Sequence, residues 1–180
     1  SAALRASQSQ PAGGLLADAV EIALTLAAIQ GWNGPPLDPG APLPDVHRAR
    51  LEKAAAWMKN SDCNPMVRIS FAAQVLHRSG VWASTEMAHE AVALLSESLE
   101  QKWPVGGYLM RHILTPFNAM PKDASWSQSA DRFMKAWLQR CAADETEDKD
   151  YGRGYWPERA VIFAPLELFA RSGNSELLDR

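Results

Sequence analysis

Apolar residues recur along most of this chain with the three-to-four-residue spacing of an α-helix. The stretch 65–79 places Ile69, Ala73 and Leu76 on one side, as in a helix that buries one face. Similar segments are separated by short runs rich in glycine, proline or serine, and none alternates apolar and polar residues as a strand would. The pattern predicts helices over residues 15–30, 45–59, 64–80, 84–103, 106–118, 127–141 and 157–171.

Helices of this length joined by short loops are typical of antiparallel packing. We therefore predict an all-α fold, an antiparallel stack or bundle of about six to eight helices without a significant sheet. No sequence repeat with a period of about 34 to 45 residues is found. Packing of the helical-repeat kind without sequence repetition stays open.

The ends of the helices carry recognisable signals. We expect Asp45, Ser84 and either Ser127 or Ser129 to cap the helices that follow them, because their side-chain oxygens can accept a hydrogen bond from a free backbone N–H. Asn64 before Pro65 gives a cap followed by a first-turn proline. Glycines 31 and 80 stop the helices that precede them.

Two expectations concern burial. The first predicted helix is apolar almost all the way round, and so is the segment from 157 to 171, where Pro165 should cause a kink. Both helices should therefore be buried on several sides. The seven tryptophans, at 32, 57, 82, 103, 126, 137 and 156, are expected to serve mainly as large core anchors.

The chain of 180 residues is long enough for one domain with a real core. We predict a loose N-terminal segment over 1–13 and a single helical domain over 14–180. Residues 34–44 (GPPLDPGAPLP) should form an extended loop. Because the sequence begins at Ser1 without methionine, we expect its natural N-terminus to be missing, which hides any signal peptide. We expect a cytoplasmic protein and leave the periplasm open.

Composition and charge narrow the function classes. The net charge of −3 argues against direct nucleic-acid binding, and no apolar run is long enough to span a membrane. Cys63 and Cys141 match no metal spacing; we expect two free thiols, with a single disulfide as the alternative. The basic side of the second helix (Arg48, Arg50, Lys53 and Lys59) should be solvated and paired with nearby acids.

Catalytic and metal motifs are weak or missing. Glu86 and His89 have the Glu-x-x-His spacing of helical di-iron sites, but His47, His77 and His112 lack a glutamate at that spacing. We interpret the pair as part of a solvated face that Glu86, Glu90, Glu97 and Glu100 share. No phosphate-binding loop or nucleophile elbow occurs. We predict no enzyme activity, no metal and no cofactor.

The strongest functional candidate is the acidic run near the C-terminus. Five carboxylates fall within residues 144–150, and aromatic residues follow. An acidic surface edged by aromatic side chains can steer a basic protein partner and anchor it. The alternative is a solubilising loop. The predicted partner-binding residues are Asp144, Glu145, Glu147, Asp148, Asp150, Tyr151, Tyr155 and Glu158.

This region resembles the C-terminal part of the PoNi-type bacterial immunity proteins. The resemblance covers residues 126–178 and rests on the runs FMKAW (133–137) and YGRGYWPERA (151–160). Gly154, Tyr155 and Trp156 match the family pattern, whereas Glu158 stands one place early and Arg159 occupies the usual glutamate position. The resemblance implies an all-helical protein that binds and occludes a cognate secreted toxin, in that family a DNase.

Two other function classes compete with this hypothesis. A helical adaptor or chaperone-type scaffold would bind several proteins weakly, whereas an inhibitor would bind one basic toxin tightly. An enzyme ranks third. The sequence also leaves a homodimer open.

Overall fold

The computed structural model describes residues 12–32, 34–59, 63–103, 105–147 and 170. Within these ranges the chain forms six α-helices and no strand, so the all-α prediction is confirmed. The helices are α1 (Ala12–Ile29), α2 (Asp45–Met58), α3 (Pro65–Ser79), α4 (Thr85–Glu100), α5 (Gly107–Ala119) and α6 (Ala124–Glu147). A single 3₁₀ turn, η2 (Gly80–Trp82), follows α3.

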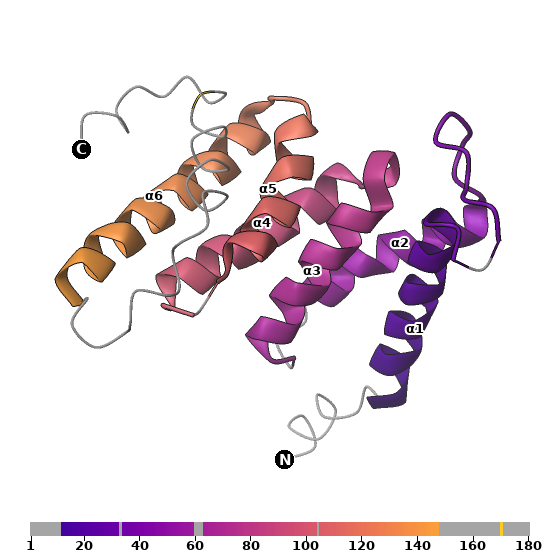
Figure 1. The fold of residues 1–180 in the computed structure, drawn as a ribbon, viewed down its shortest axis with the longest axis horizontal. Coiled ribbons are helices and arrows are strands. Elements are labelled where there is room, and N and C mark those ends of the chain that lie inside the picture. Colours follow the sequence, from indigo (N-terminus) through magenta and orange to yellow (C-terminus); the bar gives the residue numbers. More distant parts are fainter. Residues whose placement is uncertain (1–11, 33, 60–62, 104, 148–169, 171–180) are drawn as a thin grey trace, which may run out of the picture.

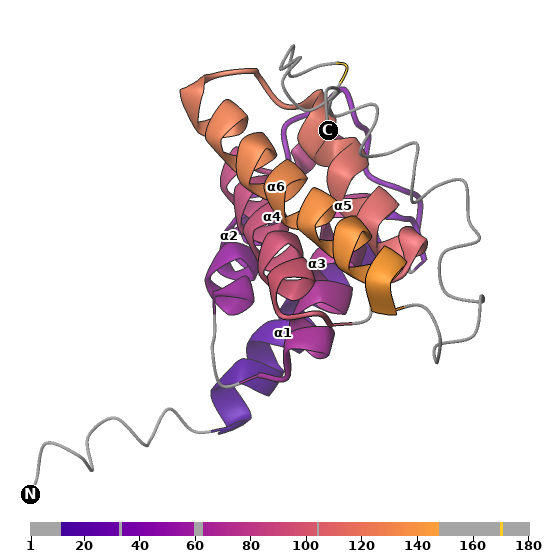
Figure 2. The same cartoon turned by 90° about the vertical axis from the view of Figure 1, so that its left-hand side faces the viewer.

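The helices stack in two layers, and most helices pack on their neighbours one and two places along the chain (Figure 1). Helices α1, α3 and α5 form the odd layer, and α2, α4 and α6 form the even layer. Figure 2 looks along the stack from its α6 end. Helices α3 and α5 run in the same direction, because Gln74 and His77 of α3 meet Tyr108 and His112 of α5 in the same order.

Helix α4 is the centre of the stack and packs against α2, α3, α5 and α6. Its apolar residues therefore cover far more than one stripe. The residues with little or no exposed surface are Met87, Ala88, Ala91, Val92, Leu94, Leu95 and Leu99. Small side chains at Ala88 and Ala91, facing a core that also holds Ala72 and Ala73 of α3, allow the helices to approach closely.

Buried serines in the core satisfy their own hydroxyl groups. Ser96 and Ser98 of α4 donate to the carbonyl oxygens of Val92 and Leu94, at 2.8 and 2.7 Å, and Ser79 of α3 donates to Val75. Each bond runs one helical turn back, so the hydroxyls need no partner from another element. Polar residues thus enter the core without an unpaired hydroxyl.

The structure confirms four of the predicted helix boundaries. Asn64 accepts a hydrogen bond from the Met66 N–H at 2.9 Å with Pro65 in the first turn. Ser84 accepts from Met87 at 3.1 Å. Gly31 and Gly80 have φ of +72° and +57°, a conformation that ends helices and suits glycine.

Two predicted caps are wrong. Asp45 lies inside α2, where it pairs with Arg48 at 3.4 Å, and Pro44 occupies the cap position. Helix α6 begins at Ala124 rather than after Ser127 or Ser129, because Asp123 accepts from the Trp126 N–H at 2.8 Å. The Asp123 carboxylate caps the first turn of α6, so the helix begins before Ser127 and Ser129.

The expected burial of α1 is also wrong. Val20 and Leu24 are 50% and 48% exposed, because α1 lies at the end of the stack and packs only against α2 and α3. Of the tryptophans with described side chains, Trp57 and Trp126 are buried, while Trp32 is 62% exposed. The number of tryptophans in the sequence therefore overestimated how many of them are buried in the core.

The proline-rich connection over residues 34–44 is a loop, as predicted. Asp38 accepts a hydrogen bond from the Gly40 N–H at 2.9 Å, and Leu43 is buried in the main core. Arg48 donates to the Leu43 carbonyl at 3.0 Å. The C-terminal end of the loop, which leads into α2, is therefore held against the stack.

Several predictions fall beyond the described residues. These are the loose segment up to residue 11, the helix expected over 157–171 with its kink at Pro165, and the burial of Trp156. Ala12 and Gly13 belong to α1, so the predicted loose segment was two residues too long.

Replacing Trp126 should destabilise the domain strongly. Trp126 is 1% exposed, stacks on Phe117 with ring centroids 5.3 Å apart, and donates from Nε1 to the Phe117 carbonyl at 3.0 Å. We expect Trp126→Ala to lower the free energy of unfolding by about 3–5 kcal/mol in urea titrations. The matched control Trp32→Ala should cost about 1 kcal/mol or less; equal losses would contradict this packing.

Candidate partner-binding surface

The predicted partner-binding residues divide between described and undescribed parts of the chain. Asp144, Glu145 and Glu147 belong to the last turn of α6. Asp148, Asp150, Tyr151, Tyr155 and Glu158 lie outside the described residues. The expectation that the acidic run forms a loop is wrong for its first half, because α6 continues past the predicted end at Cys141 to Glu147.

This placement works against local helix stability. The C-terminal end of a helix carries a partial negative charge from its unpaired carbonyl groups, and carboxylates there cost roughly 0.3–1 kcal/mol each at the surface. Three acidic residues and no basic residue occupy the last turn of α6. Helix end and carboxylates therefore add their negative potentials at one end of the stack (Figure 1).

Several acidic residues elsewhere in the described chain pair with basic residues of a neighbouring helix. Lys53 of α2 pairs with Asp18 and Glu21 of α1 at 2.9 and 3.0 Å. Lys59 pairs with Glu86 and Glu90 of α4. These hydrogen-bonded carboxylates raise the pKa of both lysines. The predicted pairing of the basic side of α2 is thus confirmed for these two lysines.

The far end of α4 shows the same arrangement. Glu100 accepts from both Nε and an Nη of Arg132 on α6, each at 3.2 Å. The hydrogen bonds to Glu100, and then its charge and that of Glu97, raise the pKa of Arg132. The glutamates of α4 therefore link the even layer together instead of forming a free acidic surface.

The Glu86 and His89 pair does not form a metal site. Glu86 is engaged by Lys59, whereas the His89 Nδ1 lies 2.8 Å from the Ser129 hydroxyl of α6. His89 is half-buried with its ring edge-on to Phe117, so its expected solvated position is wrong. Over the described ranges no group of three or more histidine, cysteine, aspartate or glutamate side chains could hold a metal ion.

The Ser129 and His89 contact has the distance of a nucleophile and its base, but it lacks the third member of a triad. In catalytic triads the second imidazole nitrogen binds an acid that orients the ring. The His89 Nε2 is buried without a hydrogen-bond partner in the described part of the chain. We interpret the contact as a structural link between α4 and α6.

Sequence reasoning missed a second surface, on the odd layer. The ring of His112 in α5 lies between His77 of α3 and Tyr108 of α5, with centroid distances of 3.8 and 3.9 Å. At the end of α1, the Arg78 guanidinium lies 4.4 Å from the centre of the exposed Trp32 ring. One sequence signal could have found this surface, because neither 65–79 nor 107–119 contains an aspartate or glutamate.

None of the described helices is long and apolar enough to cross a membrane. Comparison of the chain with protein-family models, with characterised proteins and with solved structures finds no match. The resemblance to immunity proteins therefore stays a prediction, and function must be argued from the surfaces themselves.

His112 should make the stability of the domain depend on pH. Burial, then the neighbouring charges of His77 and Arg111, lower the pKa of His112. The unfolded chain, with a histidine pKa of about 6.5, binds this proton more tightly than the folded protein. The stabilising contribution is thus complete above about pH 6.5 and is lost as the pH falls through the lower folded-state pKa.

We therefore expect the melting temperature to fall between pH 8 and pH 5, and to fall less in His112→Gln. Thermal melts of both proteins across this range check the prediction. His47→Gln serves as the control, because His47 instead contacts the Thr25 hydroxyl at 3.1 Å. A pH profile of His112→Gln identical to that of the native chain would contradict the assignment.

Proposed function

We propose that this protein is an immunity protein that binds a basic, secreted toxin and blocks it by occlusion. The observation that carries the proposal is the concentration of Asp144, Glu145 and Glu147 in the last turn of α6. Acidic side chains at this position cost stability instead of adding to it. A function that needs a strong negative potential at one end of the molecule gives a reason for that cost.

The chemistry of the proposed partner follows from this potential. A protein that acts on DNA carries a basic active-site groove, since it must bind phosphates. An acidic end fits such a groove and raises the rate of encounter. Inhibition then needs no catalytic residue, metal or cofactor in this chain. It needs only a complex that dissociates slowly enough to keep the toxin from its substrate.

The rest of the predicted site extends the same surface in sequence. Asp148 and Asp150 bring the run to five carboxylates, and Tyr151 and Tyr155 supply aromatic groups of the kind that anchor interfaces. Glu158 completes the proposed set. The resemblance to PoNi-type immunity proteins covers this region and favours a DNase as the toxin.

Co-expression with the product of the adjacent gene tests the proposal directly. We expect a stoichiometric complex on size-exclusion chromatography, and DNA degradation by the partner that stops when this chain is added. The association rate should fall as salt rises, because exposed charges are screened within about 8–10 Å at physiological ionic strength. The absence of a complex, or of a toxic activity to silence, would overturn the proposal.

Reversing the acidic run to lysine should separate binding from folding. With Asp144, Glu145, Glu147, Asp148 and Asp150 all changed to lysine, the partner complex should weaken by at least about 100-fold. The melting temperature should stay the same or rise, because lysine suits the negative end of α6. Binding measured by interferometry and thermal melts give the two readouts.

A pair of matched variants serves as the control. Asp144→Lys with Glu145→Lys changes the net charge by the same amount as Asp45→Lys with Glu52→Lys on α2. Asp45 and Glu52 are both exposed. Only the first pair should weaken the complex by about tenfold or more. Equal weakening by the two pairs would mean that net charge alone, and not the end of α6, controls binding.

A helical adaptor is the second candidate, and the two-layer stacking of the helices favours it. Solenoid proteins stack helix pairs in this way and present one layer as an extended binding surface. An adaptor would bind several proteins, whereas an inhibitor would bind one toxin tightly. Affinity measurements with the purified toxin distinguish the two.

A further inference from the structure

The odd layer carries a surface of opposite charge to the end of α6. Helices α3 and α5 contain no aspartate or glutamate, and their only titratable side chains are Arg68, His77, Arg78, Tyr108, Arg111 and His112. In contrast, α4 contains four glutamates and no lysine or arginine. Helices α3 and α5 thus carry positive charge and no carboxylate, in a protein whose net charge is −3.

A continuous chain of side-chain contacts crosses this layer from α1 to α5. Arg78 lies over Trp32 and donates from Nε to the side-chain Oε1 of Gln74 at 2.9 Å. Gln74 in turn donates to the Tyr108 hydroxyl at 3.4 Å. Tyr108 stacks against His112, and His112 against His77. We call this set, together with Arg111, the odd-layer band.

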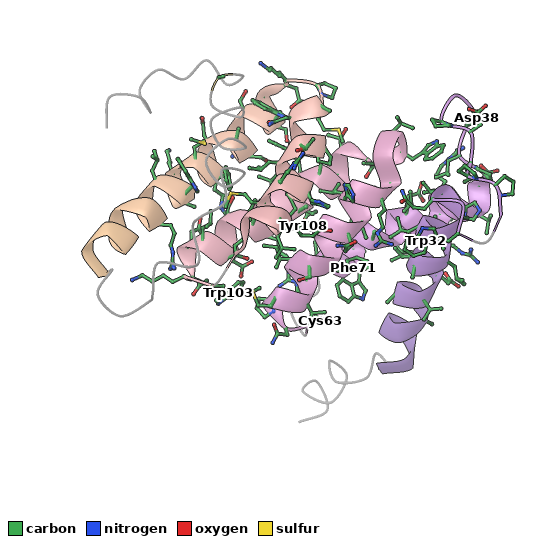
Figure 3. All side chains as sticks on the ribbon, viewed as in Figure 1. Trp32, Asp38, Cys63, Phe71, Trp103 and Tyr108 are labelled. Carbon is green, nitrogen blue, oxygen red and sulfur yellow. The ribbon has the colours of Figure 1, made fainter. Side chains whose placement is uncertain are left out.

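The odd-layer band is open to solvent. Trp32 and Tyr108 are 62% and 53% exposed, and His77 and Arg111 are exposed as well. Figure 3 labels Trp32 beside α1 and Tyr108 towards the middle of the stack. Exposed tryptophan, tyrosine and arginine are the residues most enriched at the energetic centres of protein interfaces.

Within the described ranges, the arginines of the odd-layer band lack the carboxylate partners that three basic residues of the even layer have. Lys53, Lys59 and Arg132 each have carboxylate partners. In the part of the chain that the structure describes, neither Arg78 nor Arg111 forms an ion pair. The nearest acids of α1, Asp18 and Glu21, are engaged by Lys53 on the other layer.

We propose that the odd-layer band is a docking surface for an acidic peptide segment of a protein partner. Carboxylates of the segment would pair with Arg78 and Arg111, and apolar or aromatic side chains between them would lie on Trp32 and Tyr108. The contacts among Trp32, Arg78 and Gln74 hold the guanidinium in place before binding. This lowers the conformational entropy that docking costs.

Charge complementarity selects this occupant. A nucleic acid would also pair with arginine and stack on aromatic rings, but two arginines in a chain of net negative charge provide little phosphate neutralisation. A peptide needs only a few ion pairs and two apolar anchors. This inference is independent of the proposed immunity function, which uses the other end of the molecule.

Fluorescence anisotropy with a defined probe tests the proposal. The probe is a fluorescein-labelled twelve-residue peptide that repeats Glu-Tyr-Glu-Leu three times. A serine analogue of the same charge and a single-stranded oligothymidylate with an equal number of phosphates are compared with it. We expect the Glu-Tyr-Glu-Leu peptide to bind with micromolar affinity, and the other two probes at least tenfold more weakly.

Variants locate the binding surface. Arg111→Glu, Tyr108→Ala and Trp32→Ala should each weaken peptide binding by about tenfold while melting temperatures stay close to that of the native chain. The matched control is Lys135→Glu, which makes the same charge change on the exposed face of α6. It should change the affinity by less than twofold. The variant with five lysines in the acidic run should retain binding.

Three outcomes would overturn the proposal. Failure of the peptide to bind at 200 micromolar would do so, and equal weakening by Arg111→Glu and Lys135→Glu would reduce it to a general charge effect. Tighter binding of the oligothymidylate than of the peptide would assign the odd-layer band to single-stranded nucleic acid instead.

Discussion

The burial of α4 between its neighbours is the constraint on which the rest of this structure depends. Packing against α2, α3, α5 and α6 forces nearly every side of α4 to be apolar or small. Ser96 and Ser98 satisfy their buried hydroxyl groups through carbonyls of the same helix. Packing against α4 stabilises each neighbouring helix, since isolated helices of this length are only marginally stable in water.

The same central position explains how charge is distributed. The exposed edges of α4 carry glutamates that reach sideways to Lys59 at one end and Arg132 at the other. These ion pairs are exposed and each contributes little to stability, about 0–1 kcal/mol. Their larger effect is on the electrostatic field of the protein, because they offset the negative charges of glutamates in α4. Arg78 and Arg111 of the odd layer form no ion pair within the described ranges.

The molecule therefore offers two surfaces of opposite sign that use different physical devices. The end of α6 adds carboxylates to a helix terminus that is already negative. The odd-layer band instead fixes two arginines among aromatic rings and imidazoles. An immunity protein needs the first surface. The proposed docking of an acidic peptide would use the second, so the two proposals make separate demands on the chain.

The sequence by itself determined the helices. Apolar spacing located all six described helices, and local signals at Asn64, Ser84, Gly31 and Gly80 set their ends correctly, because helix capping depends on residues within one turn. Where two local signals competed, the sequence could not choose: Asp123 displaced Ser127 and Ser129 as the start of α6. The acidic run was also identified from the sequence, although half of it proved helical.

Only the tertiary structure decided which faces are covered. An apolar helix such as α1 is half exposed because it lies at the end of the stack, and Trp32 faces solvent while Trp126 fills the core. The odd-layer band joins residues from 32 to 112 that no sequence spacing connects. Burial and surface charge depend on which helices become neighbours, and that choice is a property of the whole packed chain, not of any segment within it.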